Sequence, residues 1–400
     1  MFRSKSIIEK TELYSANNYY PLPVVITSGS GVWLTDIEGK MYLDMFSAYS
    51  TENFGQCHPY IVGALTCQVR RLGTTSRSVY TDVYAQFAQA IDELCLMDKI
   101  LPANGGAEAV ETAIKLARKW GYEKKEGVNP NQAHIIFCDN NFHGRTVSVI
   151  SGSDSIQNRN GFGPFTPGFS LVPFGDPDAF GQSITKNTVG FILEPIQGEG
   201  GIIVPPDGYL KEVEKICRRY NVLLILDEIQ TGFGRTGCNF AYEYEGVRPD
   251  ILILGKALGG GMLPVSAVLS RKDIMEVLRP GDHGSTFGGN SLACAVGIAT
   301  IELLIEGNFA SKSANLGKYF ISELKQIKSH LVKDIRGRGL MIGLELIESP
   351  CIGRRFCEAM LREGVLCKET KNSVIRFSPP LIIEKKELDL AIEKIKKVLK

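Results

Sequence analysis

Four short apolar segments between residues 134 and 254 constrain the fold of this chain more than any other feature of its sequence. Helix-period segments separate them, so residues 100–270 alternate between the two patterns. This alternation is typical of βαβ units on a parallel sheet. We therefore predict an α/β fold with a large domain, whose mainly parallel sheet is flanked by helices. The four predicted strands are His134–Phe137, Gly190–Leu193, Val222–Leu226 and Ile251–Leu254.

The segments on either side of this region have different patterns. Residues 24–46 contain short alternating runs joined by a turn at Glu38-Gly39, which predicts a small antiparallel unit. After residue 290 helical and strand patterns follow one another, which predicts a smaller α+β domain with helices at Ala314–His330 and Arg354–Glu363 and a terminal helix. The predicted limits are residues 1–46 for the N-terminal segment, 47–284 for the large domain and 285–400 for the smaller domain.

Composition excludes several classes of protein. The 400 residues are 44% hydrophobic and 22% charged, with a net charge of +1, as in an ordinary globular protein. Such a balance offers no basic surface for a nucleic acid. No apolar run approaches the roughly 18 residues that cross a bilayer, and MFRSKSIIEKTEL lacks the apolar core of a leader, so we expect a cytoplasmic protein without a membrane partner. The ten cysteines and five histidines are scattered, which favours free thiols and no metal site.

Each predicted strand is followed by distinctive polar or aromatic residues. Ligands bind beyond the carboxyl ends of strands in open parallel sheets, so one pocket would collect these side chains. The alternative is that each is simply a polar residue where a buried strand meets solvent. The residues in question are Phe142 and His143 after the first strand, Glu194 after the second, Asp227 after the third and Lys256 after the fourth.

Lys256 and Asp227 together indicate a cofactor. Lys256 directly follows ILILG, where burial would lower the pKa of its amine and leave it able to form a Schiff base. A lysine that extends to solvent is the alternative. Asp227 could pair with a protonated pyridine nitrogen, which is how proteins make pyridoxal phosphate (PLP) an electron sink. Lysine and aspartate at neighbouring strand ends therefore predict PLP.

A phosphate site is the third requirement for that cofactor. Asn104-Gly105-Gly106-Ala107 precedes a strong helical pattern over Ala107–Trp120, and backbone N–H groups at such a helix start bind anions. The same arrangement is common in enzymes that bind no phosphate. Phe142 could stack on the cofactor ring or belong to the core, and His143-Gly144-Arg145 could clamp a carboxylate.

A competing motif points to a different enzyme class. Gly232–Gly237 fits the dinucleotide pattern G-x-G-x-x-G of a nicotinamide-dependent dehydrogenase. In that motif the first glycine directly follows a strand and the last opens a helix. Here DEIQT intervenes and CNFAYEYEGVRPD has poor helical character, so we regard the dehydrogenase as a remote alternative. A regulatory protein that keeps the fold without catalysis is another alternative.

Longer motifs carry a family resemblance. LLILDEIQTGFGRTG followed by PDILILGKALGGG resembles the signature of the class III PLP-dependent aminotransferases, which have fold type I. FHGRT, EPIQGEGG, HGSTFGGN and RGRGLMIGLEL extend the resemblance over nearly the whole chain. Within the family the chain most resembles the ornithine aminotransferases, through NNYYPLPVV, SAYS, CHP and VIRFSPPLI.

The resemblance implies a set of cofactor-binding residues. Lys256 matches the lysine that binds PLP covalently and then moves the proton, and Asp227 matches the partner of the pyridine nitrogen. Ser285 and Thr286 match phosphate ligands that reach across from a second subunit, which implies a homodimer, or a larger assembly, with active sites at its interface. The remaining predicted cofactor contacts are Gly105, Gly106, Ala107, Phe142, His143, Glu194, Ile229 and Gln230.

The resemblance also implies the reaction. It is a ping-pong transfer of the δ-amino group of L-ornithine to 2-oxoglutarate, giving L-glutamate and glutamate 5-semialdehyde, which cyclises to pyrroline-5-carboxylate. Tyr19 and Arg145 match residues that hold the α-carboxylate end of ornithine, and Tyr49 matches a residue that favours ornithine. Glu199 and Arg376 match a switchable ion pair that frees the arginine for 2-oxoglutarate. The alternatives are a structural salt bridge at this pair and N-acetylornithine or 4-aminobutyrate as the donor.

Three departures from the ornithine aminotransferase pattern stand out. Glu52-Asn53-Phe54 lies where that pattern has a smaller, neutral stretch. Gly105 replaces a hydroxyl residue, which removes one hydrogen bond to the phosphate. Ser291 replaces a proline.

Overall fold

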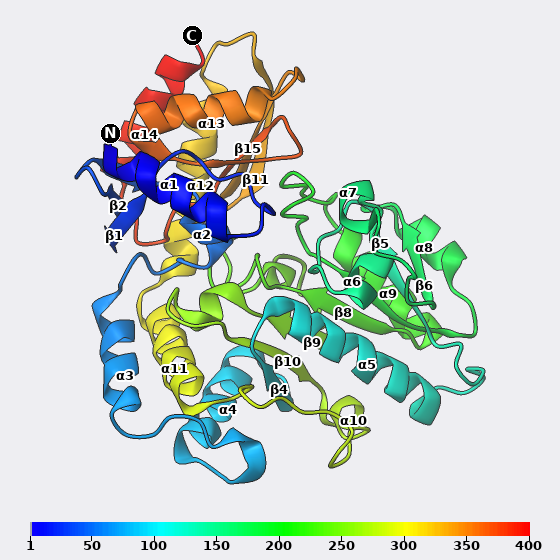
Figure 1. Ribbon diagram of the computed structural model, residues 1–400. Helices are drawn as coiled ribbons and strands as arrows, with labels where there is room; N and C mark the ends of the chain where they lie inside the picture. The colour runs from blue at the N-terminus through cyan, green and yellow to red at the C-terminus, as the bar shows by residue number, and fades with distance from the viewer. Residues whose placement is uncertain (1) are drawn as a thin grey trace.

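The computed structural model describes residues 2–400. A large sheet with helices on both sides forms the lower part of the molecule in Figure 1, and the N-terminal and C-terminal segments lie together above it. The large sheet has seven strands in the order β4-β10-β9-β8-β7-β5-β6. Their bounds are β4 Lys99–Ala103, β5 His134–Cys138, β6 Phe169–Val172, β7 Thr188–Leu193, β8 Leu223–Asp227, β9 Ile251–Leu254 and β10 Ser266–Ser270.

This sheet confirms the predicted α/β fold. The strands from β9 to β6 are all parallel, whereas β10 runs antiparallel to both of its neighbours, β9 and β4. The four predicted strands are β5, β7, β8 and β9, and β9 has the predicted limits. The carboxyl ends of four parallel strands therefore meet at one edge of the sheet, as the prediction of a shared pocket requires.

Two layers of helices cover the two faces of the large sheet. The apolar side of α5 (Gly106–Lys124) packs on one face, against alternate strand residues such as Ile225 and Ile253. Helices α8 (Pro177–Ser183) and α9 (Tyr209–Tyr220) pack on the other face with Leu224 and Leu226. Since both faces are covered, all five residues of β8 are buried. The predicted helix Ala107–Trp120 is confirmed within the longer α5.

The predicted antiparallel unit is also present. Strands β1 (Ile26–Ser30), β2 (Trp33–Asp36) and β3 (Met41–Asp44) pair in antiparallel fashion, and Gly39 occupies the β2–β3 turn with φ +87°. The short strand β13 (Val365–Leu366) adds to this sheet, parallel to β3. The N-terminal helix α1 (Phe2–Tyr14) was not part of the prediction.

A third sheet lies in the C-terminal region. Its order is β11-β12-β15-β14, and all three pairings are antiparallel. The strands are β11 Val332–Arg338, β12 Met341–Leu346, β14 Lys368–Thr370 and β15 Val374–Phe377, with helices α12 Phe309–Lys325, α13 Ile352–Arg362 and α14 Lys385–Val398. The prediction that a helix continues to His330 was wrong, because residues 326–331 form the connection into β11.

The predicted boundary at residue 285 separates helices that pack together. Helix α11 (Ser291–Glu306) packs on α3 (Pro59–Val69) and α4 (Asp82–Cys95), which belong to the large domain. We therefore propose that the large domain extends through α11 and that the smaller domain begins with α12. The remaining short elements are α2 Ser47–Ser50, η1 Ser76–Ser78, α6 Val147–Ser151, α7 Ile156–Arg159, η2 Ala241–Glu245, η3 Lys256–Gly259 and α10 Lys272–Met275.

Within residues 2–400 no single helix has the length and apolar character to span a bilayer, although α11 and α12 together meet those two criteria as a pair bent by 63°.

Candidate active site

Most of the predicted cofactor residues line one cavity of about 220 Å³ at the carboxyl edge of the large sheet. They come from four strand ends and from the start of α5, so segments more than 100 residues apart meet there. Gly144, which the sequence suggested only as part of a possible carboxylate clamp, also lines this cavity. The lining residues are Gly106, Ala107, Phe142, His143, Gly144, Glu194, Asp227, Ile229, Gln230 and Lys256.

Lys256 follows β9 and begins the short helix η3. Its backbone is left-handed, with φ +44°, after an extended Gly255. Burial lowers the pKa of its amine to about 8, the charge of Arg376 adds to this effect, and Glu199 and Asp227 oppose it. A buried lysine with such a pKa is partly neutral near pH 7, which is the form that can act as a nucleophile or a base.

The carboxylate of Asp227 is fixed at the end of β8. The backbone N–H of Ile229 donates to Oδ1 at 3.0 Å, and Nδ1 of His143 lies 2.7 Å from Oδ2. Burial disfavours the charged imidazole, but the hydrogen bond and charge of Asp227 outweigh it and raise the pKa of His143. His143 therefore holds the Asp227 side chain in place. The sequence had suggested that His143 could instead help to clamp a substrate carboxylate.

Glu194 follows the end of β7 and lines the cavity. It accepts hydrogen bonds from the N–H groups of Phe142 at 3.0 Å and Gly198 at 3.0 Å. Burial raises the pKa of Glu194 to about 7, and the nearby Asp227 adds to the rise. The contact with Phe142 fixes the loop that carries the predicted stacking ring.

The start of α5 provides an anion site. Gly105 is the N-cap residue and has no side chain to occupy the first N–H groups, so those groups remain available to a ligand. Space around Gly105 is open, with no atom within 4 Å of where a Cβ would lie. At Gly106 a Cβ would lie 3.0 Å from Ile229 Cδ1, so this position suits glycine. The helix dipole favours negative charge at this end.

Glu199 and Arg376 form a bidentate ion pair. Arg376 Nη1 donates to Oε1 at 2.6 Å and Nη2 donates to Oε2 at 3.0 Å. Although burial opposes ionisation of Glu199, the charge of Arg376 lowers the pKa of the carboxyl to about 2. Gln230 links the pair to the cofactor cavity, because its Oε1 accepts from Arg376 Nη1 at 3.3 Å.

Of the other predicted substrate residues, Tyr49 contacts this pair directly. The ring of Tyr49 lies 4.9 Å from the Arg376 guanidinium, and burial together with Glu199 raises the pKa of the Tyr49 phenol. Tyr19 is exposed but close enough to Tyr49 for its charge to influence that pKa. Arg145 is exposed, with its guanidinium 5.8 Å from the Phe142 ring.

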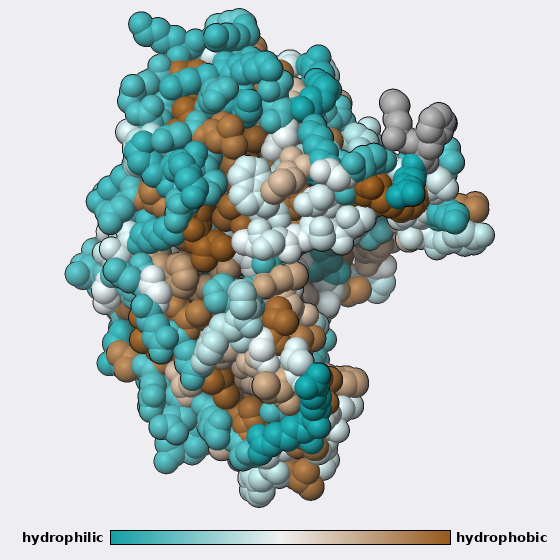
Figure 2. Space-filling model, turned by 90° about the vertical axis from the view of Figure 1, so that its left-hand side faces the viewer, coloured by the Kyte–Doolittle hydropathy of each residue, from teal (hydrophilic) through white to brown (hydrophobic). Residues whose placement is uncertain are grey.

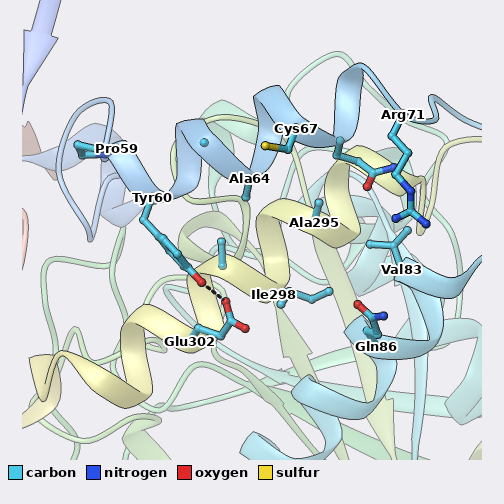
Figure 3. Close-up of a pocket in the computed structure, with 13 residues that line it drawn as sticks. Pro59, Tyr60, Ala64, Cys67, Arg71, Val83, Gln86, Ala295, Ile298 and Glu302 are labelled. Carbon is cyan, nitrogen blue, oxygen red and sulfur yellow. Dashed lines mark hydrogen bonds between the residues drawn. The ribbon is translucent and has the colours of Figure 1, made fainter.

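Three predicted cofactor contacts, Gly105, Ser285 and Thr286, do not line this chain's cavity. Gly105 lies next to it as the N-cap of α5. Ser285 accepts a hydrogen bond from the Asn104 side chain at 3.1 Å, and Thr286 is exposed to solvent. A second cavity, of about 540 Å³, lies between α3 and α11 (Figure 3) and contains none of the predicted site residues. Its polar contact joins Tyr60 Oη to Glu302 Oε2 at 2.7 Å.

Sequence patterns missed two residues that organise the site. Thr370 Oγ1 donates to the backbone oxygen of Glu199 at 2.7 Å, and the side chain of Arg235 joins three distant segments. Arg235 lies in the glycine motif Gly232–Gly237. After Gly237 the chain enters η2, which has five residues, and no long helix follows the last glycine. The structure therefore gives the dehydrogenase alternative no support.

The residues at this cavity fit PLP. An anion site at a helix start, a fixed carboxylate and a buried amine are the three groups that phosphate, pyridinium and aldehyde require. Gly106 and Ala107 would hold the phosphate, Asp227 the pyridine nitrogen and Lys256 the aldehyde carbon.

Comparison with known proteins agrees with this assignment. The family described as aminotransferase class-III matches residues 14–399. The ornithine aminotransferase of Bacillus subtilis is 53% identical over 398 residues, which cover 100% of this chain and 98% of that protein. The ornithine aminotransferase from Toxoplasma gondii has a TM-score of 0.97 at 42% identity, covering 99% of this chain and 94% of that one. Acetylornithine aminotransferase from Elizabethkingia anophelis has a TM-score of 0.90 at 43% identity, and the match covers 99% of this chain and 98% of that one.

The fold and the site define a PLP-dependent enzyme of fold type I. Its reaction class is transamination. The chain belongs to the class III aminotransferases.

Proposed function

We propose that this protein transfers the δ-amino group of L-ornithine to 2-oxoglutarate, giving glutamate 5-semialdehyde and L-glutamate. The observation that carries the proposal is the bidentate Glu199–Arg376 pair, in which the arginine is buried and the glutamate is partly buried. An unpaired arginine beside Lys256 would repel a cationic amine, whereas a neutralised one lets the amine approach. The names of the Bacillus and Toxoplasma relatives support the same donor.

The protein's own residues would supply binding and proton transfer. Bound PLP supplies the electron sink that stabilises a carbanion. Lys256 would take the proton from the donor carbon and return it to the cofactor side, since its pKa of about 8 lets it act as base and then as acid. Asp227, held by His143 and the Ile229 N–H, would keep a proton on the pyridine nitrogen.

Ornithine would lie with its two ends in different surroundings. Its distal amine would reach Lys256 past the neutralised Arg376, while Arg145 and Tyr19 would hold the α-carboxylate at the mouth of the cavity. Both of these side chains are exposed, as groups that meet an entering substrate must be. Tyr49 would line the path between the two ends.

The second half-reaction needs Arg376 free. A carboxylate of 2-oxoglutarate next to the reacting carbon would take the place of Glu199 as the bidentate partner of Arg376. Glu199 would then turn away, with Thr370 still bound to its backbone and Gln230 remaining beside the arginine. One site could thus accept a cation in one half-reaction and a dianion in the other.

The test is the absorption spectrum of the PLP-loaded protein after addition of a single amino donor without a keto acid. Loss of the lysine-bound cofactor band should be faster with L-ornithine than with N-acetylornithine or 4-aminobutyrate. A faster reaction with N-acetylornithine would assign the enzyme to the activity named for the Elizabethkingia structure, and no reaction with any of the three would overturn the proposal.

We also propose a homodimer whose partner subunit completes each site with Ser285 and Thr286. Thr286 is exposed, and apolar side chains gather on the face that carries α3 (Figure 2). Exposed apolar residues of this region include Tyr60 and Val69 of α3 and Ile305 of α11. Such a patch favours a second copy of the chain as its partner.

Subunit mixing tests the shared site. Lys256→Ala and the double variant Ser285→Ala with Thr286→Ala should each be impaired alone. Dissociated and reassociated together, they should recover about a quarter of the wild-type activity, because half of the dimers would be mixed and each would hold one intact site. No recovery in mixed dimers would contradict the exchange of residues between subunits.

We place the enzyme in the cytoplasm, since ornithine, 2-oxoglutarate and glutamate are small soluble metabolites. Fractionation of cells that express the chain would test this, and enrichment in a membrane or secreted fraction would overturn it.

A further inference from the structure

The residues that carry Tyr49 have an unusual backbone. Ser47, Ala48, Tyr49 and Ser50 all have positive φ, from +42° to +69°, and none is glycine. A left-handed conformation costs L-residues roughly 1–2 kcal/mol each. Four in succession persist only if neighbouring groups hold the turn in place.

Arg235 supplies much of that support. Its guanidinium is fully buried and donates from Nη2 to Ser47 Oγ at 3.2 Å and to Asn53 Oδ1 at 2.5 Å. Ser47 is the first residue of the left-handed turn, and Asn53 lies three residues after its last residue. Ser47 also donates from Oγ to the backbone oxygen of Ser378 at 2.5 Å.

The other side of the same guanidinium binds the C-terminal sheet. Nη1 donates to the backbone oxygens of Leu340 at 2.9 Å and Pro379 at 2.6 Å. Pro379 lies three residues after Arg376, just beyond the end of β15. Arg235 therefore connects the turn that carries Tyr49 with the strand that carries Arg376.

The same two segments also meet where Tyr49 contacts Arg376. The Arg376 guanidinium lies over the Tyr49 ring, 4.9 Å from its centroid, while Nη1 and Nη2 bind the Glu199 carboxylate. A ring in that position covers the cation and hinders the approach of a second carboxylate. While the ring stays there, Arg376 remains paired with Glu199, the state that suits a cationic donor.

We propose that Arg235 is a positioning residue that sets the preference for the amino donor by holding Tyr49 over Arg376. This inference rests on the proposed function of the Glu199–Arg376 pair. A looser turn would uncover Arg376 and favour substrates with a carboxylate next to the reacting carbon, such as L-glutamate, over L-ornithine.

Two measurements on PLP-loaded Arg235→Lys test the proposal. The first is the ratio of single-turnover rates with ornithine and with glutamate, which should fall by about fivefold or more. The second is the dissociation constant of glutarate, a dicarboxylate with no amine, which should decrease several-fold because Arg376 is more available. Glutarate binding does not depend on which amine is the natural donor, so failure of the proposed function would not hide the result.

Two further variants separate positioning from general destabilisation. In a Tyr49→Leu background the Arg235→Lys substitution should change the donor ratio little, because the ring through which it acts is gone. Arg118→Lys is the matched control. Its guanidinium donates to the Pro167 backbone oxygen and lies over the Phe169 ring, away from Tyr49, and its donor ratio should equal that of the wild type.

If Arg235→Lys does not fold, Ser47→Ala removes one acceptor and should shift the donor ratio in the same direction by a smaller factor. An unchanged ratio and unchanged glutarate affinity in the folded variants would overturn the proposal. Additive effects of Arg235→Lys and Tyr49→Leu would also overturn it, since they would show that Arg235 acts by another route.

Discussion

His143 Nδ1 lies 2.7 Å from Asp227 Oδ2, and both side chains are buried beside the cofactor cavity. Among residues 2–400, one other hydrogen bond reaches that carboxylate, from the Ile229 N–H. The imidazole therefore fixes the orientation of the group that would pair with the pyridine nitrogen.

Replacing this imidazole should weaken cofactor binding. We expect His143→Phe to raise the dissociation constant of PLP by about tenfold, because a buried carboxylate loses a charge-assisted hydrogen bond. Fluorescence titration of the cofactor-free protein measures this constant. His134→Phe is a control at the opposite end of β5, where His134 contacts Ser170, and should leave the affinity unchanged. Equal affinities in both variants would contradict the role of His143.

Covalent capture of PLP should depend on pH through Lys256. Burial holds the pKa of its amine at about 8, and only the neutral amine can attack the aldehyde. The rate at which the cofactor-free protein forms its lysine-bound absorption band should therefore rise with pH, reach half of its maximum near pH 8 and level off only at higher pH.

Lys256→Ala should lose both this band and turnover. Lys125→Ala is the control, since Lys125 is also partly buried but donates to the backbone oxygens of Thr188 and Tyr220. A Lys256→Ala protein that keeps the band and its activity would exclude the assigned nucleophile.

Removing the charge of Glu199 should change the choice of donor. In Glu199→Gln and Glu199→Ala, Arg376 is no longer neutralised, so the rate with ornithine should fall by about tenfold or more relative to glutamate or 4-aminobutyrate. Single-turnover spectra give both rates. Glu345→Gln is the control. It breaks the ion pair between Glu345 and Arg336, which lies in the same C-terminal sheet as Arg376, and it should leave the ratio of the two rates unchanged. A ratio unaltered in Glu199→Gln would favour a purely structural salt bridge.

Glu52 should make stability depend on pH. Its carboxyl is buried against Gly261 in the glycine loop after Lys256. Burial and the neighbouring Asp44 raise the pKa of Glu52 to about 7, compared with an ordinary value of 4.5. A carboxyl whose pKa is raised on folding stabilises the protein below its unfolded pKa, and that contribution is lost as pH rises from about 4.5 to about 7.

Glu52→Gln does not titrate, so its melting temperature should exceed that of the wild type by more at pH 8 than at pH 5. Differential scanning calorimetry at the two pH values measures the effect. Glu212→Gln, on the exposed side of α9, should show no such difference. An equal shift for Glu52→Gln at both pH values would mean that Glu52 does not gain its proton on folding.

The open space at Gly105 should accept a hydroxyl group. Gly105 has φ −83°, which any residue can adopt, and serine is a better N-cap than glycine. Gly105→Ser should therefore tighten PLP binding several-fold through a hydrogen bond to phosphate and should not lower the melting temperature. Gly106→Ser should weaken binding, because its Cβ would crowd Ile229 Cδ1 at 3.0 Å. Weaker binding in Gly105→Ser would show that the hydroxyl is turned away from the phosphate.

The strand ends of the site could be predicted because local sequence determines them. A buried four-residue apolar run such as Ile251–Leu254 determines where β9 ends. It therefore also places Lys256 at the carboxyl edge of the sheet. The same reasoning located Asp227 at the end of β8 and the helix that begins at Gly106.

Other features depend on contacts between distant segments, which periodicity does not report. Glu199 and Arg376 were assigned through a family resemblance, because 177 residues separate them along the chain. The support that Arg235 gives to Ser47 and Asn53 has no local signal either. The end of α12 at Lys325 is set by the need to enter β11, and helical patterning alone extends past it.

The pairing of β13 with β3 has a consequence for synthesis of the chain. Leu43 donates its N–H to the Gly364 oxygen and Met45 donates to the Leu366 oxygen, so the edge of the N-terminal sheet stays unpaired until residues 364–366 have left the ribosome. The chain is made from its N-terminus at about 5–20 residues per second, so β3 waits for tens of seconds while the large domain emerges and folds. An unpaired strand edge is a site of aggregation during that interval. We therefore expect chaperones to bind the nascent chain at its N-terminal strands.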